Sequence, residues 1–243
     1  TIIEQWRWDF GDGETYNYGT YQNPICHTYS TNGDYDVQLI VVATVGGTTL
    51  EDTVIKTLTV NPTPIAAMEF TNNCLNDTTW FYEKSITNGS PITIWHWDFG
   101  NQAVENDTAN VQDTSYVYPD FDNYIPQLIV ENEFGCIDTI TDTITIYKLP
   151  VAEFSFEEQC MSYYTYFTDE STSDSSDIMN YYWDFGNLEI LSDTSLEQSP
   201  VYIYDTTGTY IPQLIIMDDH GCSDTISHDI EIWPIPTSWF QVI

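Results

Sequence analysis

The chain has 243 residues, 42% hydrophobic and 15% aromatic, which is enough apolar material to build folded cores rather than a disordered tail. Four Lys and Arg stand against 38 Asp and Glu. The resulting formal net charge of −34 argues against nucleic acid and anionic membrane surfaces as partners, because both attract basic proteins. No apolar run approaches the roughly 20 residues of a membrane helix, so we expect no membrane insertion.

The sequence repeats itself three times. A Trp-Asp-Phe-Gly motif occurs at 8–11, 97–100 and 183–186, and a Tyr-x-x-Gln-Leu motif follows it at 35–39, 124–128 and 210–214. The second and third copies are 86 residues apart at both motifs, and the first copy lies 89 residues before the second. A fixed period of this length indicates tandem domains. We expect repeats at 1–63 (its N-terminal strands missing), 64–149 and 150–235, with 236–243 as the first strand of a further repeat.

Each copy reads as β-structure. In chain order, apolar residues alternate along 35–41 and 54–60 of the first copy, 124–130 and 140–146 of the second, and 226–232 of the third. Between the first two stretches, Gly46 and Gly47 mark a hairpin. Pro126 and Pro212 interrupt a strand pattern, so we expect an edge or a bulge there. Short strands at this density predict an all-β, immunoglobulin-like β-sandwich in each repeat.

The joints between copies are short and contain proline. They read Asn-Pro-Thr-Pro at 61–64, Lys-Leu-Pro at 148–150 and Pro-Ile-Pro at 234–236. Proline fixes φ and favours extended chain, so we expect a semi-rigid linear array whose partners are the neighbouring repeats of the same chain or fibre.

Four of the five cysteines repeat with the domains. Cys74 and Cys136 are 62 residues apart, and so are Cys160 and Cys222 one repeat later. We expect the disulfides Cys74–Cys136 and Cys160–Cys222, each within one repeat, which would place the protein outside the reducing cytosol. The alternative is two pairs of buried free thiols. Cys26 has no counterpart in the other copies, so it is either free or paired with something before residue 1.

These motifs resemble a known family. Trp-Asp-Phe-Gly-Asp-Gly at 8–13, Asn-Pro at 23–24, His-Thr-Tyr at 27–29 and Gly-Asp-Tyr-Asp-Val at 33–37 are similar to the polycystic kidney disease (PKD) domain. The second and third copies lack the Gly-Asp-Gly turn. The cysteines with the Gly-Cys-x-Asp-Thr hairpins resemble repeats of Bacteroidota gliding or adhesive proteins. That resemblance implies a cell-surface array exported by the type IX secretion route.

The repeated motifs have two readings. Trp8, Trp97 and Trp183 could form an aromatic binding platform. We favour a structural role, in which these tryptophans and the tyrosines that begin the second motif fill the cores while the neighbouring aspartates bond backbone amides. The residues concerned besides the tryptophans are Asp9, Asp98, Asp184, Tyr35, Tyr124 and Tyr210.

The sequence contains few residue patterns that would predict a metal site or a catalytic site. Acidic loops offer Asp9, Asp12, Asp169 and Asp174 as weak Ca²⁺ ligands, but no segment matches a known calcium loop, so we expect no cofactor unless calcium binds. The four histidines occupy unrelated repeat positions, and neither a Ser-His-acid order nor zinc spacing occurs. We expect no enzymatic activity.

An Asp-Thr dipeptide followed by an apolar residue or Thr recurs along the chain. It resembles the O-glycosylation signal of Bacteroidota, and its alternative reading is that Asp-Thr is common where strands begin. The candidate acceptors are Thr53, Thr78, Thr108, Thr139, Thr143, Thr206 and Thr225.

Three functions remain open from the sequence. The first is a structural stalk or fibre of an extracellular, cell-surface protein that supports adhesion or gliding and holds a tip, which could contact polysaccharide or another surface ligand. The second is a carbohydrate- or protein-binding module with exposed aromatic side chains. The third is a spacer beside a secreted hydrolase.

Overall fold

The computed structural model describes residues 2–19, 24–71, 73–157, 160–174, 176–190 and 193–238. Every regular element in these residues is a β-strand, so the predicted all-β fold is confirmed. Most of the predicted first strand of a further repeat, 236–243, lies outside the described residues.

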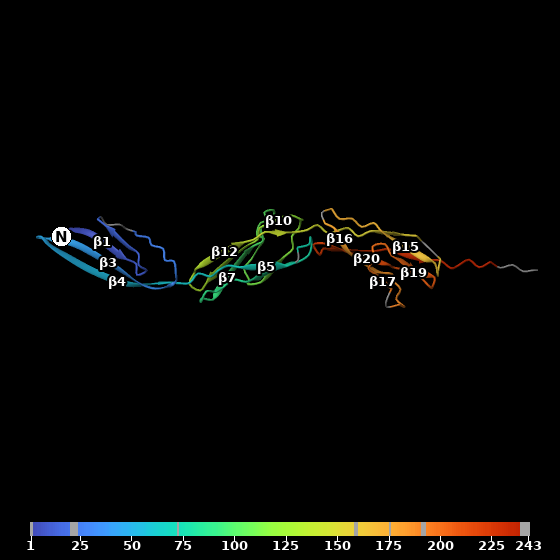
Figure 1. The fold of residues 1–243 in the computed structure, drawn as a ribbon, viewed down its shortest axis with the longest axis horizontal. Coiled ribbons are helices and arrows are strands. Elements are labelled where there is room, and N and C mark those ends of the chain that lie inside the picture. The colour runs from blue at the N-terminus through green and yellow to red at the C-terminus, as the bar shows by residue number, and fades with distance from the viewer. Residues whose placement is uncertain are drawn as a thin grey trace, which may run out of the picture. The chain divides into compact units, whose positions relative to one another are not determined.

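Repeat 1 forms one four-stranded antiparallel sheet in the order β2-β1-β3-β4 (Figure 1). Its strands are β1 Ile3–Asp9, β2 Thr15–Tyr18, β3 Gly33–Val45 and β4 Thr48–Val60. The hairpin between β3 and β4 turns at Gly46 and Gly47, which both have positive φ, as the sequence predicts.

Among the described residues, a position that faces the core in repeats 2 and 3 is open to solvent on this sheet. Leu58 of β4 is 46% exposed, whereas Ile144 and Ile230 at the same repeat position are 1% and 0% exposed. Repeats 2 and 3 place two strands ahead of the strand that carries the Trp-Asp-Phe motif, whereas the first strand described in repeat 1 is the one that carries the motif.

Repeat 2 contributes three sheets, in the orders β5-β6-β9, β12-β11-β7-β8 and β10-β13. Its strands are β5 Met68–Thr71, β6 Thr79–Glu83, β7 Ile92–Asp98, β8 Thr108–Ala109, β9 Thr114–Tyr116, β10 Asn123–Tyr124, β11 Gln127–Asn132, β12 Ile137–Thr141 and β13 Ile144–Thr145.

Repeat 3 has the same plan, with sheets in the orders β14-β15-β18, β17-β16-β20-β21 and β19-β22. Its strands are β14 Phe154–Phe156, β15 Tyr164–Asp169, β16 Ile178–Asp184, β17 Thr194–Ser195, β18 Val201–Ile203, β19 Gly208–Tyr210, β20 Gln213–Asp218, β21 Ser223–Ser227 and β22 Ile230–Ile232.

The prolines in the strand pattern break the strand. In repeat 1 the strand β3 continues through Val37, but in repeats 2 and 3 it is split at Pro126 and Pro212. The part before each proline pairs with one sheet and the part after it with another. Because proline has no N–H to donate to the ladder, the chain changes sheets there, in place of the predicted edge or bulge.

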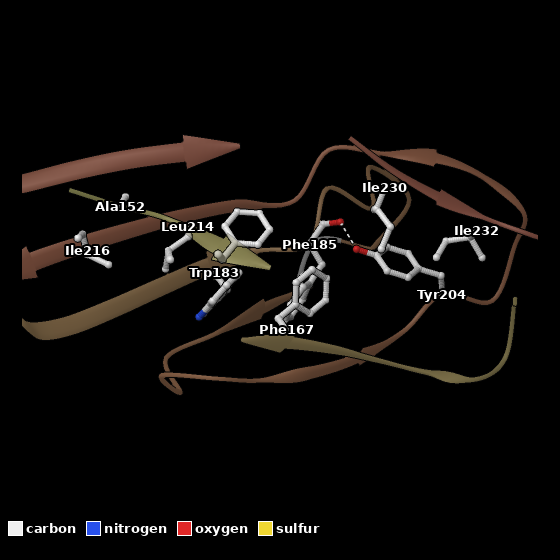
Figure 2. Close-up of a cluster of buried hydrophobic side chains, with 10 residues drawn as sticks. Ala152, Phe167, Trp183, Phe185, Tyr204, Leu214, Ile216, Ile230 and Ile232 are labelled. Atoms are coloured by element: carbon white, nitrogen blue, oxygen red, sulfur yellow. Dashed lines mark hydrogen bonds between the residues drawn. The ribbon is translucent and has the colours of Figure 1, made fainter. Parts of the chain in front are cut away.

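The core of repeat 3 is aromatic (Figure 2). Phe154, Phe167 and Trp183 pack with ring centroids 5.0 to 6.1 Å apart. Trp183, Leu214 and Ile230 have no exposed surface. Burying a side chain of this size stabilises a fold by about 1.5–3 kcal/mol, so this cluster anchors the motifs around it.

By its internal contacts the chain divides into two compact units that do not coincide with the repeats. The first comprises Thr1–Glu69, Phe81–Thr114 and Pro126–Asp142, and the second Phe70–Trp80, Ser115–Ile125 and Thr143–Ile243. The junction of repeats 1 and 2 therefore lies within the first unit, and the junction of repeats 2 and 3 within the second.

Candidate functional site

The Trp-Asp-Phe-Gly motif builds the same turn in each repeat. Asp9, Asp98 and Asp184 each accept a hydrogen bond, 2.8 to 2.9 Å long, from the amide of the glycine two residues later. Trp97 and Trp183 are fully buried, and Trp8 in the single-sheet repeat 1 is half-buried. The indole Nε1 of Trp183 donates to the Glu197 carbonyl at 2.9 Å. Trp97 and Trp183 are therefore core residues and form no open binding platform.

The missing Gly-Asp-Gly turn of repeats 2 and 3 is replaced by a second aspartate. In repeat 1 the Glu14 amide donates to Asp12 at 3.0 Å. In repeat 3 the Asn187 amide donates to Asp193, six residues later, at 2.6 Å, and the equivalent residues of repeat 2 do the same. The loop is longer, but its backbone amide is still satisfied by a carboxylate.

The tyrosines of the second motif close a corner of each repeat. Tyr35, Tyr124 and Tyr210 each donate from the hydroxyl to the carbonyl four residues earlier, over 2.8 to 3.1 Å. Such a bond resembles the tyrosine corner of immunoglobulin-like sandwiches. The motif therefore holds a loop to the strand that follows it.

A second tyrosine in each repeat was missed by the sequence analysis. Tyr204 is 1% exposed, packs 4.2 Å from the ring of Tyr210, and donates to the Phe185 carbonyl at 2.9 Å (Figure 2). Burial strongly raises the pKa of its phenol. The available signal was spacing, because a tyrosine stands six residues before each corner tyrosine, at positions 29, 118 and 204.

The four candidate calcium ligands do not come together. Asp9 and Asp12 lie in the first turn of repeat 1, and the pKa of Asp12 is lowered chiefly by its hydrogen bond with His27. Asp169 accepts from Ser171 and Gln198, and Asp174 pairs with Lys148.

Among the described residues one three-residue group has potential ligand atoms within 4.8 Å of one another, namely Asp218, Asp219 and His220. Asp218 is 3% exposed, and its carboxylate already accepts hydrogen bonds from two backbone amides and from Ser176. Its oxygens therefore serve the hairpin, and the group gives no basis for a calcium site.

The Asp-Thr dipeptides have a structural role at two positions. Asp138 and Asp224 each accept a 2.8 Å bond from the amide of an alanine 72 residues earlier, Ala66 and Ala152. The aspartate thus ties the last hairpin to the chain before the first strand. Among the candidate glycosylation acceptors, Thr78 is half-buried and the remaining six are exposed.

The structure corrects the cysteine pairing. Cys74 is bonded to Cys222, 148 residues away, and Cys136 and Cys160 are free thiols. The predicted pairs Cys74–Cys136 and Cys160–Cys222 are therefore wrong. The reason is that the two cysteines of a repeat stand beside different linkers. Cys74 bridges Tyr147 at the exit of repeat 2, whereas the Cys136 hairpin bonds Pro62 at its entry through Asn132.

Side chains around the Cys74–Cys222 bond make further contacts at the junction of repeats 2 and 3. The ring of Tyr147, at the exit of repeat 2, stacks on His220 of the repeat 3 hairpin with centroids 3.6 Å apart. Lys148 forms an ion pair with Asp174 and lies over the ring of Phe121. Both half-cystines are buried, at 8% and 1% exposure. The junction therefore combines a covalent bond with packing on both sides of the linker.

A patch of exposed aromatic side chains lies elsewhere, on β15. Tyr164 and Tyr166 point to the same face of the strand, where they are 56% and 53% exposed, and Tyr163 beside them is 57% exposed. Their intervening neighbour Thr165 is fully buried. These rings are distinct from the core set.

The sequence model of the PKD domain matches three segments of this chain, 2–58, 61–146 and 147–232. The chain belongs to the PKD domain family. The resemblance expected from the motifs at 8–13 and 33–37 is thereby confirmed for the family.

Relatives of this PKD chain include the pre-pro-metalloprotease PrtV of Vibrio cholerae, which is 35% identical over 104 residues. The match covers 42% of this chain and 10% of PrtV, so the chain spans about a tenth of that relative's length.

Among solved structures, the PKD1 domain of V. cholerae PrtV is 32% identical, with a TM-score of 0.32, over 35% of this chain and 98% of that domain. The PKD1 domain of Vibrio anguillarum Epp is 25% identical, with a TM-score of 0.33, over 37% of this chain and 99% of that domain.

Within the described residues, no helix is long and apolar enough to cross a membrane.

Proposed function

We propose that this chain is a non-catalytic structural segment that joins the parts of a large extracellular surface protein as a stiff spacer. The observation that carries the proposal is the Cys74–Cys222 bond, which links repeat 2 covalently to repeat 3. A bond inside one repeat would stabilise that repeat alone, whereas a bond between repeats also restricts how the two repeats move relative to each other. Disulfides persist in oxidising compartments, which supports an extracellular location.

The finer role of such a spacer, in adhesion or gliding at a bacterial cell surface, rests on the resemblance of the cysteine-containing hairpins to Bacteroidota repeats. The similarity to part of PrtV, a pre-pro-metalloprotease, supports a spacer beside a hydrolase equally well. Both roles require the same physical property, a fixed spacing between neighbouring parts, and neither requires a catalytic group in these repeats.

Stiffness at the junction can be measured directly. Spin labels introduced as non-canonical amino acids at the exposed Val117 and Leu196 would report the distance between repeats 2 and 3 by pulsed electron paramagnetic resonance. We expect a narrow distance distribution in the oxidised chain and a clearly broader one in the double variant Cys74→Ser, Cys222→Ser. Equal widths would show that the bond does not set the orientation, and the spacer proposal would lose its support.

A second candidate, a carbohydrate-binding module, is favoured by the exposed tyrosines of β15. Aromatic rings on a rigid strand present flat apolar faces at low entropic cost, as sugar rings require. If this role holds, a neutral polysaccharide in a native gel slows the migration of the chain. The double variant Tyr164→Ala, Tyr166→Ala should migrate as it does without polysaccharide. The control is Leu196→Ala, at another exposed apolar position of repeat 3. Identical mobility of all three chains would exclude this role for the tested sugars.

A further inference from the structure

Two of the three free thiols, Cys136 and Cys160, occupy the repeat positions of the two bonded cysteines. Cys160 lies 86 residues after Cys74, and Cys136 lies 86 residues before Cys222. The bonded pair thus consists of the first cysteine of repeat 2 and the second cysteine of repeat 3, while the free pair is their complement.

Cys160 has the backbone setting of the bonded Cys74. Each forms a parallel bridge with the residue at the exit of its own repeat, Tyr147 for Cys74 and Trp233 for Cys160. The amide of the next residue donates to that partner's carbonyl at 2.8 and 2.9 Å. The residue after that has φ of 67° in repeat 2 and 69° in repeat 3, at Asn76 and Ser162. The thiol of Cys160 is therefore held as Cys74 is held.

Cys136 likewise has the backbone setting of the bonded Cys222. Its amide donates to Asn132 Oδ1 at 3.0 Å, as the Cys222 amide donates to Asp218 Oδ1 at 2.8 Å. The glycine before each cysteine has positive φ, 79° at Gly135 and 84° at Gly221. Both hairpins thus present the cysteine in the same way, next to the linker that enters their repeat.

We propose that Cys136 and Cys160 are sites of the same bond in other junctions, each pairing with a cysteine of an adjoining repeat. Cys160 pairs with the hairpin cysteine of a repeat placed after repeat 3. Cys136 pairs with a cysteine ahead of the first Trp-Asp-Phe motif, at the position of repeat 1 that corresponds to Cys74. Repeat 1 carries Gly47 in place of a hairpin cysteine, so no bond of this kind can form at the entry of repeat 1.

Each new bond is an ordinary thiol oxidation. Two thiols lose two protons and two electrons as the S–S bond forms. Oxidised glutathione, a small-molecule disulfide, takes up both and is released as two molecules of glutathione. These bonds are expected to form whether or not the repeats act as a spacer.

The test for Cys160 uses the chain with one more repeat. A second copy of residues 150–235 follows residue 235, where Pro150 of the copy replaces the equivalent Pro236. The chain is refolded with oxidised and reduced glutathione, alkylated and mapped by mass spectrometry. We expect the alkylated Cys160 peptide to be lost and a peptide joining Cys160 to the added copy's Cys222 to appear. In a matched control, the added copy carries Cys222→Ser and Cys160 stays alkylated.

The test for Cys136 places a copy of residues 61–91 directly before Ile3, which gives repeat 1 its first strands and a cysteine equivalent to Cys74. The alkylated Cys136 peptide should then be lost in favour of a peptide joining it to the added cysteine. A Cys→Ser change at that added position is the control.

Two outcomes overturn the proposal. In one, Cys136 and Cys160 remain alkylated in the extended chains although Cys74–Cys222 forms. In the other, cysteines pair within a repeat. The first outcome leaves the Cys74–Cys222 bond and the narrow distance distribution in place, so it is distinguishable from failure of the spacer proposal, whereas pairing within a repeat removes that bond and overturns both.

Discussion

At the turn after Trp-Asp-Phe, the backbone of another segment passes so close that one position tolerates no side chain. Gly186, after Trp-Asp-Phe, has φ of +72°, and an added Cβ would lie 2.7 Å from the Ile211 carbonyl oxygen. A side chain there is disfavoured by both the left-handed backbone and the overlap. The turn therefore requires glycine for two separate reasons.

We expect Gly186→Ala to destabilise repeat 3 by about 3 kcal/mol, combining left-handed strain with overpacking. The control is Gly221→Ala, where φ is +84° but no atom lies within 4 Å of an added Cβ, and we expect a loss of about 1 kcal/mol. Pulsed hydrogen exchange along a urea series, read on peptides of β16 and β20, gives the unfolding midpoint of this repeat. Equal shifts in the two variants would contradict the overlap argument.

A histidine controls one carboxyl at the edge of repeat 3. His228 Nε2 lies 2.8 Å from Glu153 Oε1, and this hydrogen bond is the main cause that lowers the pKa of Glu153 below its ordinary value. Between the folded and unfolded pKa values the unfolded chain binds more protons, so stability is lost as the pH falls through that acid window.

In His228→Ala we expect the pKa of Glu153 to rise toward the ordinary glutamate value and the acid loss of stability to become shallower. Carbon-13 NMR titration of the Glu153 carboxyl measures the pKa directly. His220→Ala, at a histidine that does not contact Glu153, should leave it unchanged. An unaltered pKa in His228→Ala would refute the assigned cause.

At the scale of strands, the sequence predicts each repeat well because local chemistry decides the outcome. Alternation along 226–232 predicts β21 and β22, and Pro212 predicts an interruption without revealing that the chain changes sheets there. The cysteine partners could not be predicted in this way. In a repeating chain, pairing within a repeat and pairing to the next repeat recur with the same period, so only the three-dimensional position of each hairpin separates them.

The roles of the acidic residues also could not be predicted from the sequence alone. With 38 acids, the sequence offers many plausible calcium loops, and it does not reveal which acids bond backbone amides. The Asp224 carboxylate, for example, joins the last hairpin to the Ala152 amide, a contact that spans 72 residues. Its Asp-Thr dipeptide looks like a modification signal, although its aspartate serves the fold.

Asp224→Ala should therefore cost repeat 3 about 1–3 kcal/mol, because the buried Ala152 amide loses its acceptor. The adjacent Thr225→Ala, at an exposed side chain, should cost less than about 0.5 kcal/mol. Hydrogen exchange of the Ala152 amide by NMR distinguishes the two, since only the aspartate variant should exchange faster. Equal exchange rates would leave the dipeptide without its structural explanation.

At the scale of the whole molecule, stability depends on a bond that closes a long loop. Removing the Cys74–Cys222 crosslink, 148 residues in span, should lower the free energy of unfolding by about 5 kcal/mol in the chain-entropy account. Calorimetry of Cys74→Ser, Cys222→Ser against the oxidised chain measures this loss as a lower Tm. Cys26→Ser, at an exposed free thiol, should leave the Tm unchanged. An unchanged Tm in the double variant would mean that packing alone holds the junction.

The same bond also determines what happens when the chain is pulled from its ends. Residues between Cys74 and Cys222 form a closed ring, so tension passes across the sulfur atoms and the enclosed chain cannot be drawn out even if its strands unfold. The 148-residue separation corresponds to roughly 500 Å of extended chain withheld from stretching. If Cys136 and Cys160 close overlapping rings, every part of such an array lies inside at least one ring. The protein would then behave under load as a cord of nearly constant length.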